Sequence, residues 1–165
     1  MSAEEAQKHH CGADDAESQA RAIALRALAR REHTVAELRA LLARRRCAPS
    51  AIDAVIGQLE ADGYLDDAGF ARRFAADKIE FEGWGRDRIA YALRQRGVPE
   101  EHVEAALTAR DYERELEAAI TLLARRFAAL SDARAQRRAW QFLARRGYAS
   151  EVAYDAVRAV AKRRE

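Results

Sequence analysis

The feature that most constrains this chain is a sequence pattern that occurs three times, about 50 residues apart. Its three versions are ELRALLARRRCAPSAIDAVI (37–56), RIAYALRQRGVPEEHVEAAL (88–107) and RAWQFLARRGYASEVAYDAV (138–157). A period of this length is typical of tandem arrays, in which one supersecondary unit recurs and neighbouring units bury each other's apolar surface. We therefore interpret the chain as a repeat protein.

The pattern inside each repeat is helical. Ile52, Val55, Ile56 and Leu59 recur with the spacing of one helix face. Short polar or glycine-containing segments separate such stretches, and several carry helix-start signals, among them the capping box Thr34-Val35-Ala36-Glu37. The punctuation predicts nine helices, three per repeat, and no strand. Leu42, Leu93 and Leu143 correspond, as do Arg45, Arg96 and Arg146 three residues later.

Composition supports an all-α fold. The 165 residues include 39 Ala, which favours helix but fills a core poorly, and only two Pro and eight Gly for turns. We predict three tandem three-helix repeats, each resembling a helix-turn-helix, stacked into an elongated, curved array. The predicted domains are residues 21–63, 64–109 and 110–165, preceded by a disordered acidic leader, residues 1–20.

The leader and the two cysteines help to predict where in the cell the protein is located. Residues 1–20 hold five acids and one Lys, without an apolar segment typical of a secretory signal. Their neighbouring His9, His10 and Cys11 are metal ligands by type but do not form a closed site, so we predict no metal. Because no apolar run is long enough to span a membrane and two Cys form no disulfide framework, we expect a cytoplasmic protein without membrane contact.

Arginine dominates the basic residues, with 26 Arg against three Lys. Its planar donor fork suits phosphates and carboxylates, so adjacent pairs of Arg indicate a surface for a polyanion or an acidic protein face. The alternative is that these side chains only solvate the helices. The candidate contact residues are Arg30, Arg31, Arg44, Arg45, Arg72, Arg73, Arg86, Arg88, Arg94, Arg96, Arg125, Arg126, Arg145 and Arg146.

No motif indicates catalysis. Gly83-Trp84-Gly85 lacks the spacing and the lysine of a phosphate-binding loop, and no Ser or Cys is near a His and an acid in a catalytic arrangement. His33 and His102 stand among charged residues, which predicts solvated positions. The pair Asp66-Asp67 is explained by a helix N-terminus. We expect neither enzyme activity nor a cofactor.

Three segments together resemble one known family. The order Thr34-x-x-Glu37-Leu38, then GYLDDAGFARRF (63–74), then GWGRDRIAYALRQRGV (83–98) is similar to RecX, the bacterial regulator of the RecA recombinase. The resemblance covers about residues 22–160. Arg46 departs from the pattern, because the family usually has Gly where the second helix of the first repeat ends.

The resemblance implies an all-helical, non-enzymatic modulator that binds RecA and its filament on DNA. It implies inhibition of recombinase, ATPase and co-protease activities, and thereby a role in recombination, DNA repair and the SOS response. We expect a monomer whose repeated Arg residues contact the filament, with Arg86 and Arg88 beside Trp84 in the middle repeat. Weak, non-specific binding to single- or double-stranded DNA is expected as well.

Two alternatives stay open. One is a helix-turn-helix DNA-binding protein or transcriptional repressor. Two of the three candidate recognition helices begin with acids, at Glu100-Glu101 and Glu151, which disfavours insertion into a DNA groove. The other is a general adaptor scaffold.

Overall fold

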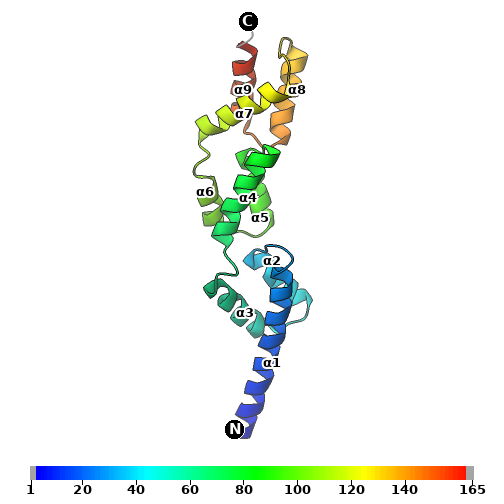
Figure 1. The fold of residues 1–165 in the computed structure, drawn as a ribbon, viewed down its shortest axis with the longest axis vertical. Helices are drawn as coiled ribbons and strands as arrows, with labels where there is room; N and C mark the ends of the chain where they lie inside the picture. Colours follow the sequence, from blue (N-terminus) through cyan, green and yellow to red (C-terminus); the bar gives the residue numbers. More distant parts are fainter. Residues whose placement is uncertain (1–2, 163–165) are drawn as a thin grey trace. The chain divides into compact units, whose positions relative to one another are not determined.

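The computed structural model describes the backbone of residues 3–162 and the side chains of residues 14–162. Over these residues it is all helical, with nine helices in three tandem groups of three and no strand, which confirms the predicted fold class (Figure 1). The helices are α1 (Ala3–Leu28), α2 (Val35–Arg44), α3 (Pro49–Ala61), α4 (Asp67–Glu82), α5 (Arg86–Gln95), α6 (Glu100–Leu107), α7 (Tyr112–Arg126), α8 (Ala133–Arg145) and α9 (Ser150–Lys162). None of the described helices has the length and apolarity that a membrane span requires.

The acidic leader differs from expectation, because α1 begins at Ala3 and includes residues 3–20. Ala, Glu and Gln are frequent in this stretch and favour helix. The end of the segment also packs: Ala20 is fully buried and Ala16 lies against the same apolar cluster. The side chains of His9, His10 and Cys11 lie outside the described residues.

The chain forms two compact units. Unit 1 comprises Met1–Phe70 together with Arg96–Val98. Its core joins α1, α2 and α3, with Leu38 and Leu42 from α2 and the predicted α3 stripe all buried. Cys47, which replaces Val98 and Tyr148 of the other repeats, packs at the edge of this core, as an apolar residue would.

Unit 2 comprises Ala71–Gln95 and Pro99–Glu165. In its last repeat, α7, α8 and α9 enclose a core that includes Leu123, Leu143 and Val157. In the middle repeat, Ile89 and Leu93 of α5 are fully buried, as are Val103 and Leu107 of α6. The corresponding residues Leu42, Leu93 and Leu143 are therefore all core residues.

Capping side chains explain where several helices begin. Thr34 and Glu37 form the predicted capping box of α2, and Asp132 accepts a hydrogen bond from the Ala135 N–H at 2.7 Å to cap α8. Asp66 accepts from the Gly69 N–H at 2.8 Å, at the start of α4. Trp140 shares a face of α8 with the buried Leu143, yet 37% of its own surface is exposed.

The turn after the second helix of each repeat needs a left-handed residue. Gly97 and Gly147 fill this position with φ of 73° and 78°, and Arg46 fills it in the first repeat with φ of 60°. A Cβ built on Gly97 overlaps the Ala36 side chain, and one on Gly147 overlaps the Arg88 side chain and lies 2.8 Å from its Cα. Arg46 is exposed, so its side chain meets no such obstacle.

Candidate interaction sites

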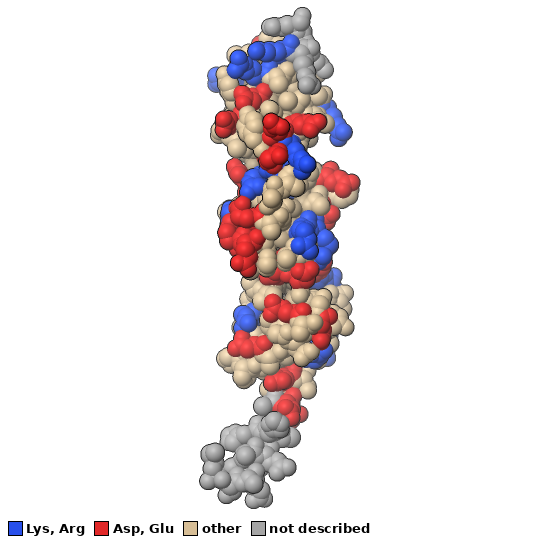
Figure 2. Space-filling view, turned by 90° about the vertical axis from the view of Figure 1, so that its left-hand side faces the viewer, with Lys and Arg blue, Asp and Glu red and all other residues tan. Residues whose placement is uncertain are grey.

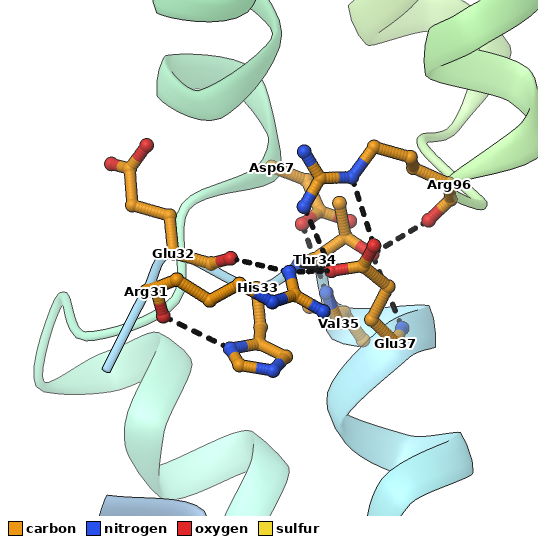
Figure 3. Close-up of polar contacts among 8 residues, drawn as sticks. All are labelled: Arg31, Glu32, His33, Thr34, Val35, Glu37, Asp67 and Arg96. Atoms are coloured by element: carbon orange, nitrogen blue, oxygen red, sulfur yellow. Dashed lines mark hydrogen bonds and ion pairs between the residues drawn. The ribbon is translucent and has the colours of Figure 1, made fainter. Parts of the chain in front are cut away.

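The N-terminus of α2 is the centre of a polar network inside unit 1 (Figure 3). The Thr34 hydroxyl donates to the Arg96 carbonyl oxygen at 2.6 Å, and the Val35 N–H donates to Asp67 Oδ1 at 3.0 Å. The Arg96 guanidinium donates to both carboxylate oxygens of Glu37, at 2.8 and 3.0 Å. It also lies over the Phe70 ring, 4.4 Å from the centroid. These contacts fix Arg96 by charge, geometry and stacking together.

Glu37 is the acceptor that holds this network together. Besides Arg96, it accepts from the Arg31 guanidinium at 2.9 Å and from the Thr34 N–H at 3.3 Å. Burial by itself raises the pKa of this carboxyl, but the hydrogen bonds from Arg96 and Arg31 outweigh burial and lower the pKa to about 2. Glu37 is therefore ionised throughout the physiological range.

His33 lies beside the same network. It is buried, with only 9% of its surface exposed, and its Nδ1 lies 3.0 Å from the Arg31 carbonyl oxygen (Figure 3). The prediction of a solvated position is therefore wrong for His33. Its neighbour Arg31 is charged, but the guanidinium donates to the Glu32 carbonyl oxygen and to Glu37, so a charged neighbour in sequence does not place the imidazole in solvent.

Unit 2 repeats this arrangement at the N-terminus of α5. The Gly85 N–H donates to the Arg146 carbonyl oxygen at 2.7 Å, and the Arg86 N–H donates to Glu115 Oε1 at 3.2 Å. Glu115 is only 3% exposed and also accepts from the Arg110 guanidinium, with Nε at 2.8 Å. Burial is thus compensated by pairing with a charge.

The two networks use corresponding positions. In each, the N-terminus of a second helix receives a carboxylate from the first helix of the following repeat, Asp67 on Val35 and Glu115 on Arg86. In each, the carbonyl group just before a turn glycine, that of Arg96 or Arg146, accepts a hydrogen bond from the same N-terminus. The 50-residue period thus repeats the polar contacts at the second-helix N-terminus as well as the three-helix fold.

Several of the predicted contact arginines already have partners within the protein. Arg86 donates to Glu104 and to the Leu107 carbonyl, and Arg94 pairs with Glu100. Arg88 donates to the Arg145 carbonyl at 2.9 Å and stacks on Trp84, 4.0 Å from the ring centroid. Others are Arg31 and Arg96, both bound to Glu37, and Arg146, which stacks on Phe142.

Other predicted arginines are exposed and line grooves. Arg30 and Arg45 lie with Arg26 around a groove of about 310 Å³ in unit 1, floored by Ile23 and Leu41. In unit 2, a groove of about 460 Å³ is lined by Arg126, Arg138 and Arg145, with Phe127 and Phe142 as its apolar part. Neither lining contains an acidic residue among those described. Arg44, Arg72, Arg73 and Arg125 are exposed as well.

The corresponding residues Arg45, Arg96 and Arg146 therefore have different environments. Arg45 is exposed, whereas Arg96 and Arg146 are half-buried and packed on aromatic rings. The face drawn in Figure 2 shows patches of Lys and Arg next to patches of Asp and Glu, not one continuous cationic surface. On this face, the positive charge is therefore divided among separate patches.

Sequence reasoning missed one basic groove, which lies between α8 and α9. It is lined by Arg137, Trp140, Tyr154, Arg158 and Lys162 and has a volume of about 390 Å³. Its signal in the sequence is the stretch 133–150, which contains no acid and five Arg. Within residues 14–162, no three His, Cys, Asp or Glu side chains are grouped so as to hold a metal ion.

Comparison with protein families gives three consecutive matches. The first three-helix domain of RecX matches residues 20–59, the second matches residues 66–107 and the third matches residues 113–157. Two relatives called regulatory protein RecX match most of the chain. The one from Deinococcus radiodurans is 42% identical over 142 residues, covering 86% of this chain and 68% of its own. The one from Thermus thermophilus is 40% identical over 141 residues, covering 86% and 92%.

Solved structures share the fold. The crystal structure of RecX from Lactobacillus salivarius superposes with a TM-score of 0.79 at 21% identity, over 89% of this chain and 97% of that one. A second crystal structure of regulatory protein RecX gives a TM-score of 0.78 at 23% identity, over 96% and 79%. The three-repeat arrangement is therefore common to proteins whose sequences have diverged widely.

Proposed function

We propose that this chain, which belongs to the RecX family of regulatory proteins, binds RecA and its filament on DNA and inhibits the recombinase, ATPase and co-protease activities. The observation that carries the proposal is the succession of all three RecX domains along the chain. Its regulatory action is non-enzymatic, works in the cytoplasm and modulates recombination, DNA repair and the SOS response. The protein acts as a monomer and needs no cofactor.

The exposed basic grooves support the proposal as contact sites. The groove with Arg30 and Arg45 and the groove with Arg126 and Arg145 each offer guanidinium groups beside apolar side chains. Such a surface fits acidic protein faces and phosphates alike. Because the grooves lie in different units, contact is multivalent, and several modest interactions combine into one strong one.

The decisive experiment measures ATP hydrolysis by RecA on single-stranded DNA with substoichiometric amounts of this protein. We expect strong inhibition by the parent protein. One exposed Arg→Ala change, such as Arg45→Ala, weakens inhibition only a few-fold, since an exposed charge contact contributes about 0.2–1 kcal/mol. Combining Arg45→Glu in unit 1 with Arg145→Glu in unit 2 weakens it far more.

The controls separate contact from stability. Arg39→Glu with Arg114→Glu makes the same change in charge at exposed positions outside both grooves and is expected to leave inhibition intact. Arg96 is unsuitable for reversal, because losing its ion pair with Glu37 would damage unit 1. If the groove double variant melts normally and inhibits as well as the parent, the groove mechanism is wrong. If the parent itself leaves RecA unaffected, the proposed function is wrong.

A further inference from the structure

The groove between α8 and α9 combines exposed aromatic rings with cations. Trp140 is 37% exposed and Tyr154 is 62% exposed, so both rings are accessible to a ligand in the groove. Arg137 lies three residues before Trp140, and Arg158 lies four residues after Tyr154, so each ring shares a helix face with a guanidinium group. Lys162 adds a third cation one turn further along α9.

All the charged side chains that line this groove are cations. None of the described residues lining it is acidic. The nearest acid in sequence, Asp155, turns toward α7, where it accepts a hydrogen bond from the Tyr112 hydroxyl. The three cations are therefore not neutralised by the groove itself, and they favour an anionic occupant.

The same positive charge continues along α8. This helix carries Arg134, Arg137, Arg138 and Arg145 and no acidic residue. At 1.5 Å per residue, the first and last of these lie about 16 Å apart along the axis. Arg138 and Arg145 line the second groove, with Phe127 and Phe142. The anion that fits this helix is therefore extended and carries several charges.

We propose that the groove between α8 and α9 binds single-stranded DNA, with a base stacked on Trp140 and Tyr154 and the adjoining phosphates at Arg137, Arg158 and Lys162. Aromatic rings beside a cationic track are the combination by which proteins hold single strands without reading their sequence. An acidic peptide would satisfy the charges but gives no role to two exposed rings. The proposal rests on the expected weak binding of DNA and assigns a site to it. It does not depend on RecA.

Intrinsic fluorescence gives a direct test. The chain has two tryptophans, Trp84 and Trp140, so Trp84→Phe leaves Trp140 as the only indole and keeps a ring beneath Arg88. We expect titration with a fifteen-residue oligothymidylate to quench this fluorescence. An abasic oligonucleotide of the same length, which keeps the phosphates, should quench little. Binding of the oligothymidylate without quenching would place the strand elsewhere.

Fluorescence anisotropy with a labelled oligothymidylate tests the individual side chains. Trp140→Leu and Tyr154→Leu are each expected to weaken binding about tenfold, as removal of a stacking ring does. Tyr91→Leu is the matched control, because Tyr91 is 64% exposed on α5, outside this groove, and its loss should leave binding unchanged. Far-UV spectra and melting curves establish that the variants are folded, and the more exposed Tyr154 provides the test if Trp140→Leu is unstable.

The outcomes distinguish failure of the groove assignment from failure of the expected DNA binding. If the parent fails to bind the oligothymidylate at low salt, the proposed DNA binding fails and the groove assignment with it. If the parent binds and both leucine variants bind equally well, DNA binding stands and the groove assignment is wrong. If a polyglutamate peptide quenches Trp140 and displaces the oligothymidylate at lower concentration, the groove is a peptide site and the proposal is overturned.

Discussion

At the scale of single residues, the turn after each second helix shows how space for a Cβ atom determines which residue types a position tolerates. Gly97 and Gly147 have positive φ and lie against neighbouring side chains, so they need both the backbone freedom and the small size of glycine. Arg46 has the same kind of φ but an open environment. The departure from the family pattern therefore costs backbone strain only, which the fold tolerates.

This contrast predicts opposite effects of substitution. Gly147→Ala should lower the free energy of unfolding by about 1–3 kcal/mol, because the new methyl group overlaps Arg88 and the φ is unfavourable. Arg46→Gly should raise it by up to about 1 kcal/mol, since glycine relieves the left-handed strain. Urea denaturation of the two variants measures both changes.

Gly57 is the matched control for these substitutions. It lies inside α3, and a methyl group added to its Cα would have no heavy atom within 4 Å, so Gly57→Ala should stabilise the protein by about 0.5–1 kcal/mol. A Gly147→Ala variant as stable as the parent would show that the close approach to Arg88 is absent in solution.

Glu37 predicts a pH dependence of stability. Its pKa is lowered from 4.5 to about 2 in the folded protein, so the folded state favours the ionised form. The stabilisation is complete above pH 4.5 and is lost as the pH falls from about 4.5 to about 2. Because the site is partly exposed to solvent, we expect a contribution of about 1–2 kcal/mol.

The measurement compares the parent with Glu37→Gln in urea denaturation between pH 2 and pH 7. The variant should be less stable at pH 7, and the difference should shrink as the pH falls through this window. Equal pH profiles for the two proteins would mean that Glu37 is not the titrating group.

At the scale of elements, Asp67 and Glu115 each accept a hydrogen bond from the N-terminus of a helix other than their own. Asp67 stands at the start of α4 but accepts from the Val35 N–H of α2. Its neighbour Asp66 has the local role, at the start of α4. The sequence pattern places both residues at a helix start, which is confirmed, but it does not reveal that Asp67 also accepts a hydrogen bond from another helix. Short-range patterns reveal local caps, whereas a cap supplied from 32 residues away depends on packing.

Substitution should separate the two roles. Asp66→Ala removes a local cap and is expected to cost about 1 kcal/mol of unfolding free energy. Glu115→Ala, at the position corresponding to Asp67, should cost about 3–5 kcal/mol, since it leaves the largely buried Arg110 guanidinium without its ion pair. Thermal and urea unfolding provide the comparison. Equal losses for the two variants would contradict the distinction.

The elements themselves are largely predictable from sequence, because each has its own periodic apolar stripe and end signals. Leu42, Leu93 and Leu143 align by spacing and are all buried. Exposure at helix edges is not predictable: Trp140 is apolar and in phase with Leu143, yet its ring reaches the surface. Nor can the sequence tell which Arg are paired, because Arg96 and Glu37 are 59 residues apart.

At the scale of the whole molecule, a small net charge hides an uneven distribution. The chain has a formal net charge of +2, and several of its acids are balanced by nearby arginines in the described ion pairs. No described acid lines the grooves formed by Arg26, Arg30 and Arg45, by Arg126, Arg138 and Arg145, and by Arg137, Arg158 and Lys162. We therefore expect local charge, not total charge, to determine any binding of polyanions.

This distribution predicts salt-sensitive DNA binding with little sequence preference. If about four to seven phosphates are neutralised, a plot of log affinity against log salt concentration has a slope of roughly −3 to −6. Anisotropy titrations between about 50 and 300 mM salt measure this slope. Strong preference for one duplex sequence that persists at high salt would instead favour the repressor alternative.

The single residue at the turn after α2 has a consequence for lengthening the chain. A protein engineer who inserted another three-helix repeat ahead of α1 would place a new second-helix N-terminus against that turn, as α5 meets Gly147. The Arg46 side chain would then occupy the space that the incoming helix needs. Such an extension would require glycine at position 46, so one codon determines whether the series of repeats can be continued in that direction.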